Sequence, residues 1–307
     1  MREYERDLIA RSASPVNARR ARSLVPPSML AKPVALLTVR ELKHLRDGLV
    51  AKGSKPASIN RDMKGLKAAL SLVASTDERI SNARAWRTGL AALPDTHNPR
   101  NVILNDSEVL ALIAAAYGEN VAFGILVECA AICGARVSQL ARLVIGDLQA
   151  DRPDPRLMMP SSRKGRGVKR IDRRPVPISA SLADKLRQAA GNRAPTEPLL
   201  LRSDDKPWQP AIQDYRQPFI NAVARVGLDP KVVTLYALRH SSIARAILAG
   251  IPPRLIAVTH DTSTAMIERS YSALIHEHGD GIVRKALLDP TQLVADNVVA
   301  LPGGGRP

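Results

Sequence analysis

Apolar residues recur along most of the chain at spacings of three and four, which is the spacing typical of amphipathic helices. In residues 36–53, Leu42, Leu45 and Leu49 share one face. Thr38 and Glu41 precede that face with the spacing of an N-terminal capping box. Residues 55–75 repeat the helical pattern with a stripe made of Ile59, Met63, Leu66, Leu70 and Val73. The first hundred residues are therefore predicted to be helical.

A similar pattern begins after residue 104. Asn105 and Glu108 form a second capping-box spacing, and a long helical stretch is predicted over 120–143. The pattern of apolar and polar residues changes at 151–180, where RLMMP and RRPVPI flank the basic segment SSRKGRGVKRID. Two short β-like runs around a Gly-containing segment predict a β-hairpin. Residues 181–288 return to a mostly helical pattern, with loops at 191–211 and 226–233.

These elements predict an α+β protein that is mainly α with a small antiparallel β-sheet. The segment AALPDTHNPRNVIL, residues 91–104, contains two prolines between helical patterns and marks a domain boundary. We expect a helical domain at 34–98, a linker at 99–104 and a mixed domain at 105–288. Residues 1–33 are expected to form a basic arm or a truncated N-terminal element, and residues 289–307 a flexible tail.

The charge balance points to a polyanionic partner. The chain has 45 Lys and Arg against 29 Asp and Glu, a net charge of +16. Such a surplus favours nucleic acid over an anionic membrane surface, and the alternative is a basic surface that serves solubility alone. The side chains expected to contact DNA phosphates lie in the helix at 55–75 and in the hairpin: Arg61, Lys64, Lys67, Arg163, Arg166, Lys169 and Arg170. A solvated basic helix face is the alternative for the first three.

Other features of the composition argue against a cysteine metal site, a secreted protein and a membrane-spanning protein. Cys129 and Cys133 are four residues apart and lack further Cys or His nearby, so two buried hydrophobic side chains are favoured over a metal site. The N-terminus is charged and does not resemble a signal peptide. The longest apolar run contains Glu128 and is too short to span a bilayer. A cytoplasmic protein without membrane contact is expected.

Three cationic positions are candidates for binding one phosphodiester: Arg136, Lys164 and Arg239. Two guanidinium groups and a lysine stabilise the charge of a phosphoryl-transfer transition state without a metal. The acidic residues are scattered, whereas metal-dependent nucleases need clustered carboxylates, so a side-chain nucleophile is expected. Tyr271 is the candidate, provided that a positive field lowers the pKa of its phenol.

The segments GARVSQL, YALRHSSIARAILAG and THDTSTAMIERSYSALI resemble, in this order, the signature motifs of the tyrosine recombinases, the phage-integrase family. The resemblance covers about residues 34–280 and implies a helical, SAM-like core-binding domain followed by a catalytic domain. It implies a site-specific recombinase or integrase that cuts and rejoins DNA through a 3′-phosphotyrosyl intermediate. It further implies no cofactor and no metal.

The resemblance assigns roles to individual residues. Arg136 and Arg239 match the two arginines that clamp the phosphate, and Tyr271 matches the nucleophile. Lys164 matches the hairpin lysine that protonates the leaving 5′ oxygen, with Lys169 as the alternative. His260 matches the position that hydrogen-bonds the phosphate.

Three positions near these residues need separate interpretations. Tyr236 stands where the family usually has a histidine, three residues before the second arginine, and is expected to donate a hydrogen bond to the phosphate. The alternative is a half-buried packing residue. Gln139 stands where the family commonly has an acid and is expected to support the site. His240 is expected to be a buried hydrogen-bonding support, and the alternative is a catalytic residue.

The implied partners are double-stranded DNA and further copies of the chain, as a homotetramer on synapsed DNA sites, together with accessory DNA-bending proteins. A bacterial or phage protein associated with the nucleoid is expected. The alternatives are a non-catalytic DNA-binding protein on the same fold and a type IB topoisomerase-like relaxing enzyme.

Overall fold

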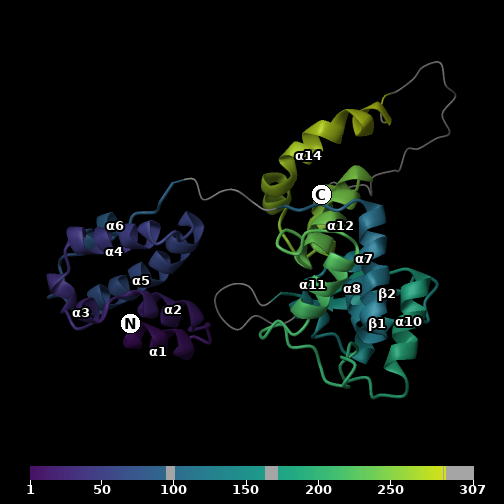
Figure 1. The fold of residues 1–307 in the computed structure, drawn as a ribbon, viewed down its shortest axis with the longest axis horizontal. Helices are drawn as coiled ribbons and strands as arrows, with labels where there is room; N and C mark the ends of the chain where they lie inside the picture. Colours follow the sequence, from purple (N-terminus) through teal and green to yellow (C-terminus); the bar gives the residue numbers. More distant parts are fainter. Residues whose placement is uncertain (95–100, 163–171, 286, 288–307) are drawn as a thin grey trace, which may run out of the picture. The chain divides into compact units, whose positions relative to one another are not determined.

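The structure is a computed structural model that describes residues 1–94, 101–162, 172–285 and 287. Figure 1 shows that the described residues form two compact units, residues 1–94 and residues 101–161 with 173–285. Of the linker predicted at 99–104, residues 99 and 100 lie outside the described residues, whereas residues 101–104 are described and belong to the second unit. In the described part of the chain no helix has both the length and the apolar character needed to cross a membrane.

The regular elements in the described part of the first unit are all helices. Its α-helices are α1 (Arg2–Ala10), α2 (Val16–Leu24), α3 (Pro27–Leu30), α4 (Val39–Ala51), α5 (Pro56–Thr76) and α6 (Arg84–Gly89), with the 3₁₀ turn η1 (Val34–Leu36). Both halves of the Thr38–Glu41 capping box are present at the start of α4, as predicted. Four of the five predicted stripe residues on α5 are buried, which confirms its apolar face.

The core of the first unit lies between α2, α4, α5 and α6, around the fully buried side chains of Leu42, Ile59 and Trp86. α6 approaches α4 closely because it ends in Gly89, where a Cβ atom would lie 2.8 Å from the Cβ of Leu42. Residues 1–33, expected to form an arm or a truncated element, contain three helices, and the buried Ala21 of α2 belongs to this core.

The second unit combines helices with a small sheet. Its helices are α7 (Asp106–Glu119), α8 (Val121–Cys133), α9 (Val137–Leu140), α10 (Ala180–Ala190), α11 (Arg216–Arg225), α12 (Tyr236–Leu248), α13 (Pro253–Thr259) and α14 (Thr264–Lys285), with the 3₁₀ turn η2 (Ile145–Asp147). Asn105 caps α7 with Glu108 as predicted. This mainly helical architecture with one antiparallel sheet confirms the predicted fold class.

The sheet has three antiparallel strands in the order β1 (Leu148–Gln149), β2 (Arg156–Pro160) and β3 (Arg173–Pro177). β2 and β3 are the two strands of the predicted hairpin, paired with Arg156 opposite Pro177 and Pro160 opposite Arg173. Buried Leu157, Met159 and Val176 join the sheet to the main core, whose other walls include α7, α8 and α10. The basic segment between these strands, residues 163–171, lies outside the described residues.

The helix predicted over 120–143 is wrong in one respect, because the chain breaks it after Cys133. Gly134 adopts a left-handed conformation with φ of +55°, which ends α8, and the single turn α9 begins at Val137. The break places Arg136 in an extended conformation between the two helices. Cys129 and Cys133 are both buried in α8, as predicted, and are not disulfide-bonded.

Candidate functional site

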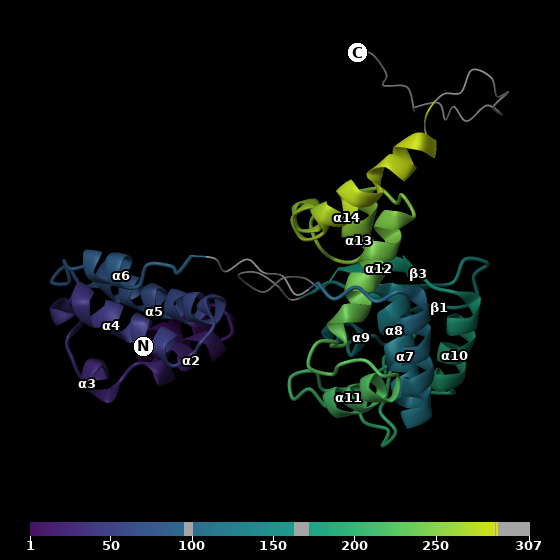
Figure 2. The same cartoon turned by 45° about the horizontal axis from the view of Figure 1, so that its top comes forward.

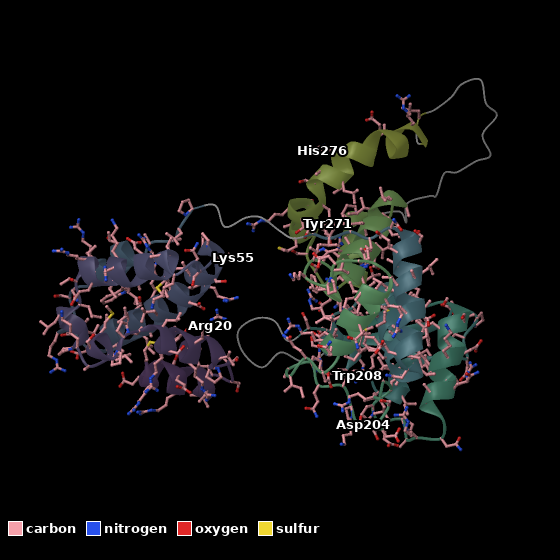
Figure 3. All side chains as sticks on the ribbon, in the orientation of Figure 1. Arg20, Lys55, Asp204, Trp208, Tyr271 and His276 are labelled. Carbon is pink, nitrogen blue, oxygen red and sulfur yellow. The ribbon has the colours of Figure 1, made fainter. Side chains whose placement is uncertain are left out.

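The candidate site lies in the second unit, where α12, α13 and α14 meet the turn between α8 and α9. Figure 3 shows Tyr271 on the part of α14 that packs against the unit, and Figures 1 and 2 show the far end of this helix standing clear of it. Tyr271 and Ile267 are buried in a small apolar cluster with residues of α12 and α13, among them Ile243 and Ile256. The ring is therefore held by packing, and only 5% of the residue is exposed.

The hydroxyl of Tyr271 is hydrogen-bonded to a histidine. Its oxygen lies 2.6 Å from Nδ1 of His240, which belongs to α12. Burial raises the pKa of Tyr271 well above its usual value, although the nearby charge of Arg239 lowers it. The charge of Arg239 therefore acts in the expected direction, but in the protein without DNA desolvation outweighs it.

Arg239 is the most buried cation of the site. It is 3% exposed, and its Nη1 donates to the carbonyl oxygen of Gly134 at 2.7 Å. Burial is the first cause, and repulsion from Arg136 the second, of the lowered pKa of this guanidinium. An arginine that is buried and faces a second cation favours the binding of an anion beside it.

Arg136 is fixed from three sides. Its Nη1 donates to the carbonyl oxygen of Asp261 at 3.1 Å and approaches the carboxylate of Asp261 at 3.3 Å. Gln139, which is 1% exposed, accepts from the backbone N–H of Arg136 at 3.2 Å and donates to the carbonyl oxygen of Pro160 at 2.8 Å. The glutamine thus ties the arginine to the end of β2, in agreement with its expected supporting role.

Asp261 and Arg174 complete this corner and were not predicted to belong to the site. The Nη2 of Arg174, on β3, lies 2.5 Å from the carboxylate of Asp261, and its Nη1 donates to the carbonyl oxygen of Val258. The Nε groups of Arg136 and Arg174 are buried without a hydrogen-bond partner among the described residues. The Nε–H group of each guanidinium therefore remains an unused donor.

Both ring nitrogens of His260 lie within hydrogen-bond distance of neighbouring groups. Its Nδ1 lies 3.1 Å from the carbonyl oxygen of Ile256, so this nitrogen carries the hydrogen, and its Nε2 lies 3.0 Å from the hydroxyl of Ser242. Burial and the charge of Arg239 lower the pKa of His260 to about 4, so the ring is neutral at pH 7. In this tautomer Nε2 accepts hydrogen bonds, and a donor role toward phosphate requires the proton to move to Nε2.

Tyr236 is the first residue of α12 and is 46% exposed. Its ring centroid lies 6.0 Å from the Cζ atom of Arg239 and 5.0 Å from the ring of His240, which it meets edge to face. A pocket of about 740 Å³ opens beside Tyr236 and Arg136, with further lining from Arg216 and Lys231. The exposure of Tyr236 to this basic pocket favours a ligand-facing residue over a packing residue.

The structure thus brings together five of the six predicted catalytic residues: Arg136, Tyr236, Arg239, His260 and Tyr271. Lys164 lies outside the described residues, as do the predicted DNA contacts Arg163, Arg166, Lys169 and Arg170. Arg61, Lys64 and Lys67 belong to the first unit, where Arg61 and Lys64 are exposed and Lys67 is half-buried. Within the described ranges, no three His, Cys, Asp or Glu side chains converge as metal ligands.

The fold is similar to that of solved DNA integrases. The integrase of the Tn1549 transposon, solved with transposon right end DNA, superposes with a TM-score of 0.69 at 18% identity, over 92% of this chain and 98% of that one. A lambda integrase fragment, solved as a dimer on a COC′ core site, superposes with a TM-score of 0.64 at 20% identity, over 86% and 94%. The resemblance to the tyrosine recombinases is thus confirmed at the level of the fold.

A third similar structure is a lambda integrase tetramer bound to a Holliday junction, with a TM-score of 0.64 at 20% identity, over 85% of this chain and 72% of that one. The sequence itself matches no family model and none of the curated proteins.

Proposed function

We propose that the protein is a site-specific DNA recombinase or integrase that cuts and rejoins DNA through a 3′-phosphotyrosyl intermediate. The observation that carries this proposal is the position of Tyr271 in an integrase fold. Its hydroxyl reaches α12 beside buried Arg239, and the charge of that guanidinium acts on it. A tyrosine placed beside an anion-binding arginine is suited to attack a bound phosphodiester.

The roles of the other residues follow from their chemistry. Arg136 and Arg239 would hold the two non-bridging oxygens of the phosphate and stabilise the charge of the transition state. Tyr236, exposed beside Arg239, would donate a hydrogen bond to the same group. Lys164, or Lys169 in its place, would protonate the leaving 5′ oxygen. The phosphotyrosyl bond would retain the energy of the broken bond, so a 5′ hydroxyl would rejoin the strand without ATP or a metal.

Double-stranded DNA is the proposed substrate, in line with the net charge of +16. The similar integrase structures include a dimer on a core site and a tetramer on a Holliday junction. Recombination joins two duplexes with two cuts each, so we propose that four copies of this chain act together, with accessory DNA-bending proteins as further partners. The exposed basic residues of α5, Arg61 and Lys64, together with Lys67, are the proposed phosphate contacts of the first unit. A cytoplasmic, nucleoid-associated protein of bacterial or phage origin fits this function.

The test is the covalent intermediate. DNA fragments that remain attached to the denatured protein are sequenced to find the target site, and a nicked suicide substrate built on that site is then incubated with the protein. The parent is expected to yield a protein–DNA adduct on a denaturing gel, and Tyr271→Phe is expected to bind the DNA without forming it. An adduct of normal yield from the Phe variant would refute the assignment. DNA binding without any adduct from the parent would identify a non-catalytic DNA-binding protein instead.

Relaxation of supercoiled plasmid distinguishes the remaining alternative. A recombinase is expected to join two site-containing duplexes into recombinant products. Relaxation of plasmids that lack the site, without recombinants, would indicate a type IB topoisomerase-like enzyme.

A further inference from the structure

His240 is the side chain in contact with the reacting atom of the proposed nucleophile. Its Nδ1 lies 2.6 Å from the hydroxyl oxygen of Tyr271, within the range of about 2.6–3.2 Å over which a general base takes a proton. The two residues come from different helices, α12 and α14, and are 31 positions apart. This contact is therefore made by the tertiary fold.

The direction of the hydrogen bond follows from the two protonation states. Burial raises the pKa of Tyr271, so the phenol keeps its proton and is the donor. Burial and the charge of Arg239 lower the pKa of His240, so the imidazole is neutral at pH 7 and Nδ1 is the acceptor. The hydrogen of the neutral ring is then on Nε2. Among the described residues, the titratable and charged groups around His240 are Tyr271 on α14, and Tyr236 and Arg239 on its own helix.

The two alternative residues, His260 and Tyr236, do not make this contact with the Tyr271 hydroxyl. His260 directs its ring nitrogens to Ser242 and to Ile256. Tyr236 meets the ring of His240 edge to face, one helical turn earlier on the same face of α12. One turn after Tyr236 on α12, the imidazole of His240 thus faces the proposed nucleophile.

Building on the proposed function, we propose that His240 is the general base of strand cleavage and the general acid of strand rejoining. In cleavage the Tyr271 oxygen forms a bond to phosphorus, and the bond from phosphorus to the 5′ oxygen breaks. The Tyr271 proton passes to Nδ1 of His240, while the leaving 5′ oxygen takes its proton from the hairpin lysine or from water. In rejoining, a 5′ hydroxyl attacks phosphorus and gives its proton to the hairpin lysine or to water, the bond from phosphorus to Tyr271 breaks, and the His240 imidazolium returns the proton to the phenol oxygen.

The first test is single-turnover cleavage of the suicide substrate at a series of pH values. The parent rate is expected to be level near neutral pH and to fall in acid, because Nδ1 becomes protonated below the ordinary His pKa of about 6.5. His240→Gln is expected to cleave about 10²- to 10⁴-fold more slowly and to lose this acid limb. His276→Gln, which changes an exposed histidine further along α14, is the matched control and is expected to keep the parent rate and profile.

A second substrate separates proton removal from protonation of the leaving group. Replacing the bridging 5′ oxygen by sulfur gives a leaving group that needs no acid, so this DNA is expected to restore cleavage by Lys164→Ala. It is not expected to restore cleavage by His240→Gln, because the phenol proton must still be removed. Full restoration of His240→Gln by sulfur would overturn the base assignment.

A measurement without DNA checks the contact itself, independently of the effect of any variant on catalysis. ¹⁵N-labelled histidine in the parent is expected to show His240 as a neutral ring with an unprotonated Nδ1, and Tyr271→Phe is expected to shift that nitrogen. A ring protonated on Nδ1 at pH 7 would overturn the proposal.

The kinetic outcomes also separate this inference from the proposed function. A His240→Gln variant that forms the adduct as fast as the parent at every pH, or faster, would overturn the base role and leave the phosphotyrosyl chemistry standing. A parent that forms no adduct on any DNA would refute the proposed function, and the role of His240 with it.

Discussion

The carboxylate of Asp261 lies 3.3 Å from Nη1 of Arg136 and 2.5 Å from Nη2 of Arg174. The aspartate adopts a left-handed backbone conformation with φ of +51°, which Asp tolerates better than most residues. One negative charge thus lies between two arginines at the place where a DNA phosphate is proposed to bind. The protein supplies its own anion to Arg136, and a phosphate has to compete with it.

This competition predicts the effect of Asp261→Asn on DNA binding. The amide keeps the shape of the side chain and removes its charge, so DNA affinity is expected to rise. The slope of log affinity against log salt is expected to steepen by up to about one unit, because one more phosphate contact releases counterions. Fluorescence anisotropy at several salt concentrations measures both. Asp204→Asn, at the end of the unit opposite Tyr271 in Figure 3, is the control that removes the same charge away from the site. Equal effects from the two variants would assign the change to net charge alone.

Tyr236 yields a second prediction, since this exposed residue is proposed to bind the phosphate through its hydroxyl. Tyr236→Phe is expected to remove one charge-assisted hydrogen bond, worth about 1.5–3 kcal/mol, and to slow single-turnover cleavage roughly 10- to 100-fold. The edge-to-face contact with His240 survives this change, so the acid limb of the pH profile is expected to remain. Cleavage at the parent rate would leave Tyr236 as a residue that only covers His240.

His260 predicts how the stability of the second unit depends on pH. Its pKa is about 4 in the folded protein and near 6.5 in the unfolded chain, so between these values the unfolded state binds more protons. His260 contributes about 3 kcal/mol to the free energy of unfolding. This contribution is fully present above pH 6.5 and is lost as the pH falls toward 4. Urea unfolding followed by Trp208 fluorescence, in a Trp86→Phe background, reports this unit alone. His260→Gln is expected to show a correspondingly flatter dependence on pH, whatever its absolute stability.

Gly134 predicts a steric requirement at the turn that carries Arg136. A Cβ atom there would lie 2.5 Å from Cδ2 of His260, in a backbone conformation with φ of +55°. Gly134→Ala is expected to destabilise the second unit by the strain of a left-handed alanine, about 1 kcal/mol, and by a further 1–3 kcal/mol of overpacking. Gly227→Ala separates the two effects, because Gly227 also has a positive φ but open space around it. Equal losses of unfolding free energy in the two variants would show that His260 yields to the new methyl group.

The proposed chemistry also predicts that cleavage does not depend on a divalent metal. The two guanidinium groups are proposed to stabilise the transition state, so the rate of adduct formation is expected to be unchanged in excess chelator. Loss of cleavage that added magnesium restores would contradict this mechanism. Arg239→Ala is the internal comparison and is expected to lose cleavage with or without the metal.

Local signals made much of the fold predictable. The capping boxes at Thr38 and Asn105 and the strand RLMMP depend on residues a few positions apart, and the structure confirms all three. The break after Cys133 was missed because α8 is apolar on all sides. Its sequence therefore shows no helical periodicity whose end would mark the end of the helix. Gly134 is a local signal for this break, because glycine commonly ends a helix in a left-handed conformation.

The sequence predicts those residues of the candidate site that belong to the signature motifs. The contact between His240 and Tyr271, and that between Asp261 and the two arginines, join segments that are distant in the sequence or lie on different elements. One signal for His240 was present, since it follows Tyr236 by four residues and so shares its face of α12. Whether burial or the charge of Arg239 has the larger effect on the pKa of Tyr271 depends on packing, which a local sequence pattern does not indicate.

The burial of Tyr271 has a consequence for the fate of a cut strand. Its ring packs in the small cluster with Ile243, Ile256 and Ile267, where the residue is almost inaccessible to water. A phosphodiester attached to that oxygen is charged and bulky, and an apolar cluster cannot enclose it without a large cost in solvation. In the proposed reaction, breaking the DNA would therefore loosen this part of the core, and resealing the DNA would let it close again. The packing energy of the cluster would then favour the intact duplex over a persistent break.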